Sequence, residues 1–293
     1  MLLIMLSFLA CEDVIEVDLP QTESRLVVNA LIRVDTNAEF VPIEVSVAKS
    51  ANFFDTVAPA QLTSAVIFYG IPLENDPTLF EEIFSSSLAE SSPGSGVYVP
   101  DPNFSSDQRI RTSSLEPGMV FNLVMEYEGE RFLAQTTFAP TVPIDKIEQG
   151  TETLFSGEET ELIIAFNDDA SRDDFYLFDF DFNEFLVTED EFYQGETFEF
   201  SYFYDDKLEA GDTVEVSIMG ATEPFYNYMN QIIIQAGGNQ GPFQTPVATV
   251  RGNIINITGI DNETVLDNVA RSDNFALGYF AVVQEFSRSI TIE

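Results

Sequence analysis

Apolar and polar residues alternate over much of the chain, and this period of two predicts β-strands with one buried face. The clearest case is a hairpin over residues 121–138, in which Glu128-Gly129-Glu130 makes the turn between two alternating runs. Pro117-Gly118 marks another turn just before it. About seven short strands and no convincing helix over residues 25–140 predict a β-sandwich of the immunoglobulin or transthyretin kind.

The run Ala139-Pro140-Thr141-Val142-Pro143 interrupts this pattern. Prolines at this spacing do not continue a central strand, so we place a domain boundary here. Residues 141–293 are then predicted to form a second β-sandwich. Two aromatic stripes at a spacing of two run through it: Tyr176, Phe178, Phe180 and Phe182, then Phe198, Phe200, Tyr202 and Tyr204. Such stripes are more often the buried face of a sheet than a ligand platform.

One segment of the second domain has the period of a helix. Glu223-Pro224 is typical of a helix start, because proline is tolerated in the first turn. Apolar residues then fall on one face at spacings of three and four, and Gly237-Gly238 ends the pattern. The sequence therefore predicts an all-β protein with a single amphipathic helix at residues 224–236.

The first ten residues are apolar apart from Ser7, and Cys11 follows at once. Ten residues are too few to span a bilayer but match the apolar core of a secretory signal. The order small residue then cysteine resembles a bacterial lipoprotein signal, so we expect residues 1–10 to be cleaved and Cys11 to carry the lipid. Residues 11–24 are acidic and polar and are expected to form a tether. A buried free cysteine in a strand is the alternative.

Composition excludes several classes of function. Twelve basic and 50 acidic residues give a formal charge of −38, so the chain would be repelled by nucleic acid. The absence of histidine excludes Ser-His-Asp and Cys-His catalysis. A glycosidase-type pair of carboxylates stays open, but nothing selects two residues from 50. We therefore do not expect an enzyme.

The charge is concentrated in residues 145–215, which hold 23 acidic and 3 basic residues. Within this segment Asp168-Asp169 and Asp173-Asp174 flank a short loop after a predicted strand, where their oxygens could bind calcium. The loop lacks the spacing of the known calcium loop. We favour a solvated acidic loop without a cofactor, and keep calcium as the alternative.

Two loops are predicted to carry contacts with a partner. Residues 50–60 contain Phe53-Phe54, and residues 237–246 contain Phe243. Nothing in the local pattern buries these aromatic residues, and loops presented by rigid sheets usually carry recognition. Docking of the same residues onto the neighbouring domain is the alternative interpretation.

Several motifs together resemble the outer-membrane lipoproteins of Bacteroidota that contain domain of unknown function 4249. The matching stretches are Cys11-Glu12-Asp13-Val14, Arg25-Leu26-Val27-Val28, Pro143-Ile144-Asp145-Lys146-Ile147 and Leu277-Gly278-Tyr279-Phe280. The resemblance covers most of the chain and implies association with a TonB-dependent outer-membrane transporter. It supplies no catalytic residues. Glu12-Asp13 also resembles the surface-export signal of this phylum, which implies the outer face of the membrane.

These observations lead to one expected function and one alternative. We expect a lipid-anchored outer-membrane accessory protein that binds a TonB-dependent transporter in nutrient capture. A structural or adhesive surface module without a transported ligand is the alternative.

Overall fold

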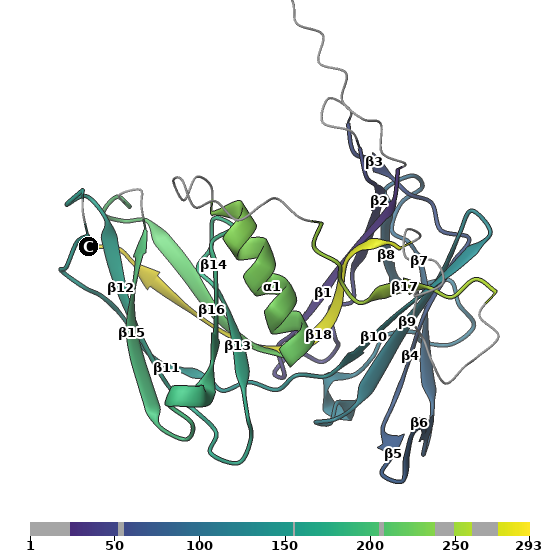
Figure 1. Cartoon of the computed structure of the whole chain (residues 1–293), viewed down its shortest axis with the longest axis horizontal. Helices are drawn as coiled ribbons and strands as arrows, with labels where there is room; N and C mark the ends of the chain where they lie inside the picture. Colours follow the sequence, from purple (N-terminus) through teal and green to yellow (C-terminus); the bar gives the residue numbers. More distant parts are fainter. Residues whose placement is uncertain (1–23, 52–55, 155, 205–207, 238–248, 260–274) are drawn as a thin grey trace, which may run out of the picture.

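The computed structural model describes residues 24–51, 56–154, 156–204, 208–237, 249–259 and 275–293. These residues form a mostly β structure with two lobes that lie side by side and one helix between them (Figure 1). The first lobe is built around strands β1–β10 and β17, and the second around β11–β16. The prediction of an all-β fold with a single helix is confirmed.

The first lobe contains one long curled sheet in the order β1-β2-β8-β7-β4-β9-β10-β17. Strict alternation of side chains puts one face of β9 in the core, as the sequence pattern predicts. The predicted hairpin is β9–β10, in which Tyr127 pairs with Glu130. The strands of this lobe are β1 (Leu26–Val34), β2 (Val45–Lys49), β3 (Ala58–Pro59), β4 (Ser64–Gly70), β5 (Pro72–Leu73), β6 (Asp76–Phe80), β7 (Phe84–Glu90), β8 (Val97–Pro100), β9 (Val120–Tyr127), β10 (Glu130–Thr137) and β17 (Ile254–Asn256).

In the second lobe a three-stranded sheet, β11-β12-β15, packs on the sheet segment β14-β13-β16-β18. Aromatic residues from both predicted stripes fill the space between them, and Tyr176, Phe178 and Phe180 are fully buried. The strands are β11 (Ile144–Gln149), β12 (Thr160–Asn167), β13 (Phe175–Asp179), β14 (Phe185–Glu189), β15 (Thr197–Tyr204) and β16 (Thr213–Ala221). Two short 3-10 helices, Thr112–Ser114 in the first lobe and Asp190–Phe192 in the second, complete these lobes.

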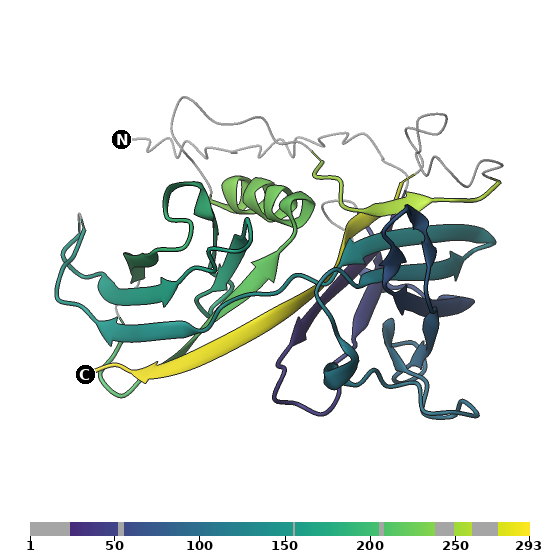
Figure 2. The same ribbon diagram turned by 90° about the horizontal axis from the view of Figure 1, so that it is seen from below.

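Strand β18 (Leu277–Thr291) belongs to both lobes (Figure 2). Its first half runs parallel to β1 as far as the pair Val34–Gln284. Its second half runs antiparallel to β16, beginning at Met219–Glu285. β16 therefore continues the pairing where β1 ends.

The lobes consequently differ from the expected division into residues 25–140 and 141–293. β17 pairs with β10, and the first half of β18 pairs with β1, so the C-terminal segment also contributes to the first lobe. The hydrophobic period shows where strands occur but not which strands pair, and for this reason the sequence pattern could not place β17 and β18.

Helix α1 (Glu223–Ala236) confirms the predicted helix and begins one residue earlier. Thr222 caps it, because its side chain accepts a hydrogen bond from the N–H of Phe225. The helix packs across the opposite face of the second-lobe sheet, where Phe225 and Tyr228 contact Tyr279 of β18. No helix in the described part of the chain is long and apolar enough to cross a membrane.

Arg33 lies at the junction of the two lobes, near the end of β1. Its guanidinium donates hydrogen bonds to Glu285 on β18, to Asp179 on β13 at 2.7 Å and to Ser217 on β16 at 3.0 Å. Burial alone would lower the pKa of Arg33, but hydrogen bonding to the two carboxylates raises it overall. One side chain therefore connects four strands from the two lobes.

Candidate functional site

The acidic loop proposed as a cation site joins β12 to β13, and its four aspartates point in two directions. Asp168 and Asp174 are buried, whereas Asp173 is exposed and Asp169 is partly exposed. The first pair faces the aromatic core and the second faces solvent, so the structure does not gather the four carboxylates around one point.

Both buried aspartates accept hydrogen bonds from neighbouring groups of the protein. The hydroxyl of Tyr176 donates to Oδ1 of Asp168, and the N–H of Gly195 donates to Oδ2 at 2.6 Å. Asp174 accepts three hydrogen bonds from the guanidinium of Arg172, at 2.8, 3.1 and 3.3 Å. Burial raises the pKa of Asp174, although Arg172 acts in the opposite direction. The pKa of Tyr176 is raised as well, mainly by burial and to a smaller extent by its hydrogen bond to Asp168.

The two outward aspartates have local partners as well. Asp169 accepts hydrogen bonds from the N–H and the hydroxyl of Ser171, which lower its pKa. Asp173 accepts a hydrogen bond from the side-chain amide of Gln194 at 2.9 Å. Within the described ranges no group of three or more Asp, Glu, Cys or His side chains is arranged to hold a metal ion. The solvated loop without a cofactor stays the prediction, and calcium stays the alternative.

A pocket of about 530 Å³ lies at the far end of the second lobe. Its walls come from the end of β11, the start of β12 and the last two residues of the chain: Gln149, Gly150, Thr151, Glu152, Thr153, Glu159, Thr160, Glu161, Leu208, Glu209, Ala210, Ile292 and Glu293. Glu159 accepts hydrogen bonds from the N–H groups of Leu154, Ser156 and Gly157. Hydrogen bonding, above all from the N–H of Ser156, lowers the pKa of Glu159 to about 2.

Glu161 in the same wall is buried and accepts hydrogen bonds from the hydroxyl of Ser201 and the N–H of Glu152. Its carboxylate lies against Gly150, at a position that a Cβ on residue 150 would occupy. The carboxylates of Glu159 and Glu161 are thus used to organise the backbone of this wall.

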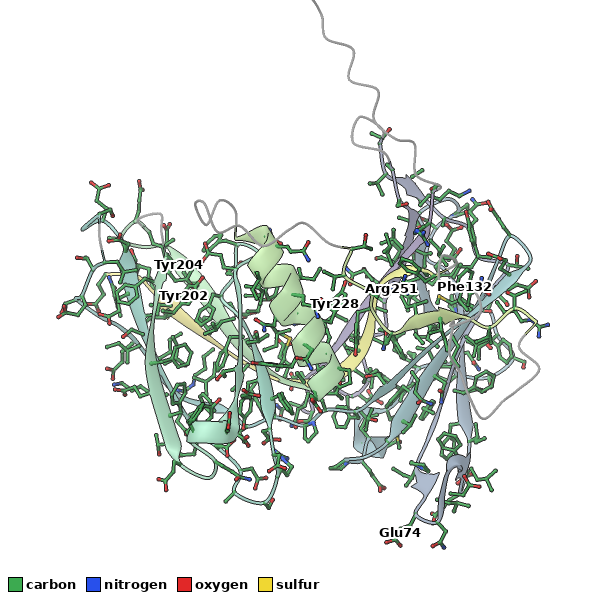
Figure 3. All side chains as sticks on the ribbon, in the orientation of Figure 1. Glu74, Phe132, Tyr202, Tyr204, Tyr228 and Arg251 are labelled. Carbon is green, nitrogen blue, oxygen red and sulfur yellow. The ribbon has the colours of Figure 1, made fainter. Side chains whose placement is uncertain are left out.

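The start of β1, where the N-terminal segment enters the fold, is fastened by two arginines. The guanidinium carbons of Arg25 and Arg251 each lie 4.0 Å from the ring centroid of Phe275. Figure 3 labels Arg251 close to the point where β18 begins. Cation–π contacts of this kind stabilise a site by about 0.5–2 kcal/mol. The sequence carries no signal for this cluster, because Arg25 and Phe275 are 250 positions apart.

The remaining sequence-predicted site residues fall outside the described residues. These are the lipidation residue Cys11 and the three loop aromatics Phe53, Phe54 and Phe243. The structure therefore adds nothing to their predicted roles.

A comparison with protein-family models matches residues 12–289 to the family described as Domain of unknown function (DUF4249). The chain belongs to this family. The matched residues extend through both lobes and include helix α1 and most of the shared strand β18. None of the curated proteins compared with the chain matches it.

Proposed function

We propose that this DUF4249 protein is a recognition module of the bacterial outer membrane, held by a lipid on Cys11 and bound to a TonB-dependent transporter. The N-terminal pattern supports the anchor, since an apolar run ends at the small residue Ala10 directly before Cys11. Two acyl chains or more on one residue hold a protein on a membrane stably. The resemblance to Bacteroidota lipoproteins supports the transporter as the partner.

The observation that carries the proposal is the position of β1. This strand begins 15 residues after Cys11 and pairs on both sides, with β18 and with β2. At its start Arg25 contacts Phe275, and near its end Arg33 joins the second lobe. A central strand that follows the expected tether so closely suits a protein that holds a partner at the membrane.

Purification from native membranes tests this function. We expect the chain, expressed at its natural level with a C-terminal tag, to co-purify with a TonB-dependent transporter after mild detergent extraction. The variant Cys11→Ser is the matched control, because it removes the lipid and keeps the folded lobes. Recovery of the wild-type chain alone, after mild crosslinking, would favour the structural or adhesive module instead.

A further inference from the structure

The second lobe has an open side at which strand β14 ends the sheet. In the described residues β14 pairs only with β13. The opposite side of this lobe is closed, since Arg288 of β18 donates to the carbonyl of Asp145 on β11. A free strand edge presents backbone N–H and C=O groups to any strand that can pair with them.

The hydrogen-bond pattern shows which backbone groups of β14 face away from β13. The N–H of Phe180 donates to Glu184 O at 2.8 Å, and the N–H of Asp190 donates to Asp174 O at 3.1 Å. Bonded and non-bonded pairs alternate along an antiparallel ladder. The backbone groups of Phe185 and Val187 consequently point away from β13, toward the open side.

An exposed phenylalanine lies beyond each end of β14. Phe182 in the β13–β14 turn is 55% exposed, and Phe192 in the 3-10 helix after β14 is 89% exposed. Phe192 is the most exposed large apolar side chain among the described residues. Two large aromatic side chains beside a free edge offer pockets and contacts for the side chains of an added strand.

The backbone at Phe182 makes its exposure unusual. Asp181, Phe182 and Asn183 have φ values of 66°, 52° and 63°, and the N–H of Glu184 donates to Asp181 O at 2.8 Å. Left-handed backbone favours Gly or Asn and disfavours a bulky residue. Phenylalanine thus strains the turn at this position, and its ring meets the core edge-on at Tyr204 while it stays half exposed.

The segment that carries this edge is acidic. Residues 180–192, which contain β14 and both phenylalanines, hold five acidic residues and no lysine or arginine, and of the five only Asp190 is buried. Carboxylates beside an edge discourage pairing between identical acidic chains. They attract a basic segment, because opposite charges on facing strands stabilise the pair.

We propose that the open edge of β14, with Phe182 and Phe192, binds an extended basic segment of a partner protein by β-strand addition. The backbone groups of Phe185 and Val187 would pair with the added strand. The two phenylalanines would contact its apolar side chains, and the surrounding carboxylates its lysines and arginines. Two tyrosines of β15, Tyr202 and Tyr204, are labelled in Figure 3. Tyr202 stacks on Phe180 with ring centroids 3.6 Å apart, and Tyr204 meets Phe182 edge-on.

A peptide-binding assay with the purified full-length chain tests this proposal. The probe is a fluorescent nine-residue peptide of alternating lysine and valine, and binding is followed by fluorescence anisotropy. The first control peptide has the same charge but proline in place of every valine, so it loses the N–H groups of those residues and cannot form a regular strand. The second has glutamate in place of lysine. We expect saturable binding of the lysine–valine peptide alone, weakened by added salt.

Four protein variants locate the site. Phe192→Ala is expected to weaken binding about tenfold without changing Tm. Phe182→Asn is expected to weaken binding similarly and to raise Tm, because asparagine suits the left-handed turn. Val187→Pro removes an outward N–H and should abolish binding while circular dichroism shows a retained fold. Phe104→Ala, which truncates a 48%-exposed phenylalanine of the first lobe, should change neither quantity.

Three results would overturn the proposal. Equal binding of the proline control would show attraction by charge alone. Wild-type affinity in both Phe192→Ala and Val187→Pro would place the peptide elsewhere. A dimer in sedimentation velocity that Val187→Pro dissociates would show that the edge binds a second copy of this chain. The assay contains no transporter, so its failure would leave the proposed function standing.

Discussion

Nη1 of Arg33 lies 2.7 Å from Oδ2 of Asp179, although the two residues are 146 positions apart and belong to different lobes. Glu285 accepts hydrogen bonds from Nε and Nη2 of the same guanidinium. One cation therefore faces two carboxylates where β18 passes between the lobes. Removal of the arginine would leave two mostly buried carboxylates side by side.

Arg33→Ala is therefore expected to lower the free energy of unfolding by about 1–3 kcal/mol. Loss of a fully buried ion pair would cost more, but the Arg33 side chain is one-third exposed and solvent weakens the interaction. Arg111→Ala is the matched control, since Arg111 and Glu39 form an exposed pair. It should change stability by about 0.5 kcal/mol or less. Urea unfolding measures both, and equal losses would mean that the junction pair has no special role.

A second prediction concerns the close approach of β18 to β1 at Gly278. This residue has a φ of 92°, and a Cβ here would lie 1.9 Å from the carbonyl oxygen of Val28. Gly278→Ala is expected to destabilise the protein by about 3 kcal/mol or more, because both backbone strain and a clash result. Gly118→Ala has a similar φ of 85° and open space around it, and should cost about 1–2 kcal/mol. Equal urea midpoints for the two variants would contradict the tight β1–β18 contact.

Stability in acid should depend on Glu159. Backbone hydrogen bonds lower its pKa from the ordinary value of 4.5 to about 2, so the folded state favours the charged carboxylate. A lowered carboxyl pKa stabilises the fold above the ordinary value, and that contribution is lost as pH falls toward 2. Glu159→Gln should therefore flatten the fall of Tm between about pH 4.5 and pH 2. Glu158→Gln, which removes one carboxylate from the same turn, should keep the wild-type slope.

Calcium is expected to stabilise the protein no more than a monovalent salt of equal ionic strength. Asp168 and Asp174 are buried and already accept hydrogen bonds from Tyr176 and Arg172. Few carboxylate oxygens of the loop are therefore left for calcium, which binds six to eight oxygen ligands. Differential scanning calorimetry makes the comparison. A calcium-specific rise in Tm that disappears in the double variant Asp168→Asn with Asp173→Asn would establish the cation site.

The sequence predicted those parts of the fold that depend on local signals. The β9–β10 hairpin followed from alternation and the Glu128-Gly129-Glu130 turn, and α1 from its apolar period and its first-turn Pro224. Partner choice depends on contacts far apart in the chain. The parallel pairing of β1 with β18 and the contact of Arg25 with Phe275 therefore left no local signal.

The predicted sites show the same limit. Phe182 was expected on the buried aromatic stripe, and this was wrong, because β13 ends at Asp179 and residue 182 lies in the turn. Phe192 was missed, although its exposed neighbour Glu191 could have marked a solvent-facing position. Carboxylates dominate the sequence, so their pairing with donors such as Tyr176 became visible only in three dimensions.

The predicted anchor has its own direct test. Mass spectrometry of the N-terminal peptide from membrane-extracted protein should find residues 1–10 removed and acyl chains on Cys11, because the apolar run ends at Ala10. An unmodified Cys11 with Met1 to Ala10 still attached would contradict it.

Crosslinking in intact cells tests the central claim most directly. A carbodiimide joins carboxylates to nearby amines, and a chain with 50 acidic residues offers many reactive groups to a bound partner. At natural expression the account predicts a crosslinked product that contains this chain and a TonB-dependent transporter, identified by mass spectrometry and lost in Cys11→Ser. Products that contain only copies of this chain, or a transporter product that persists in Cys11→Ser, would contradict it.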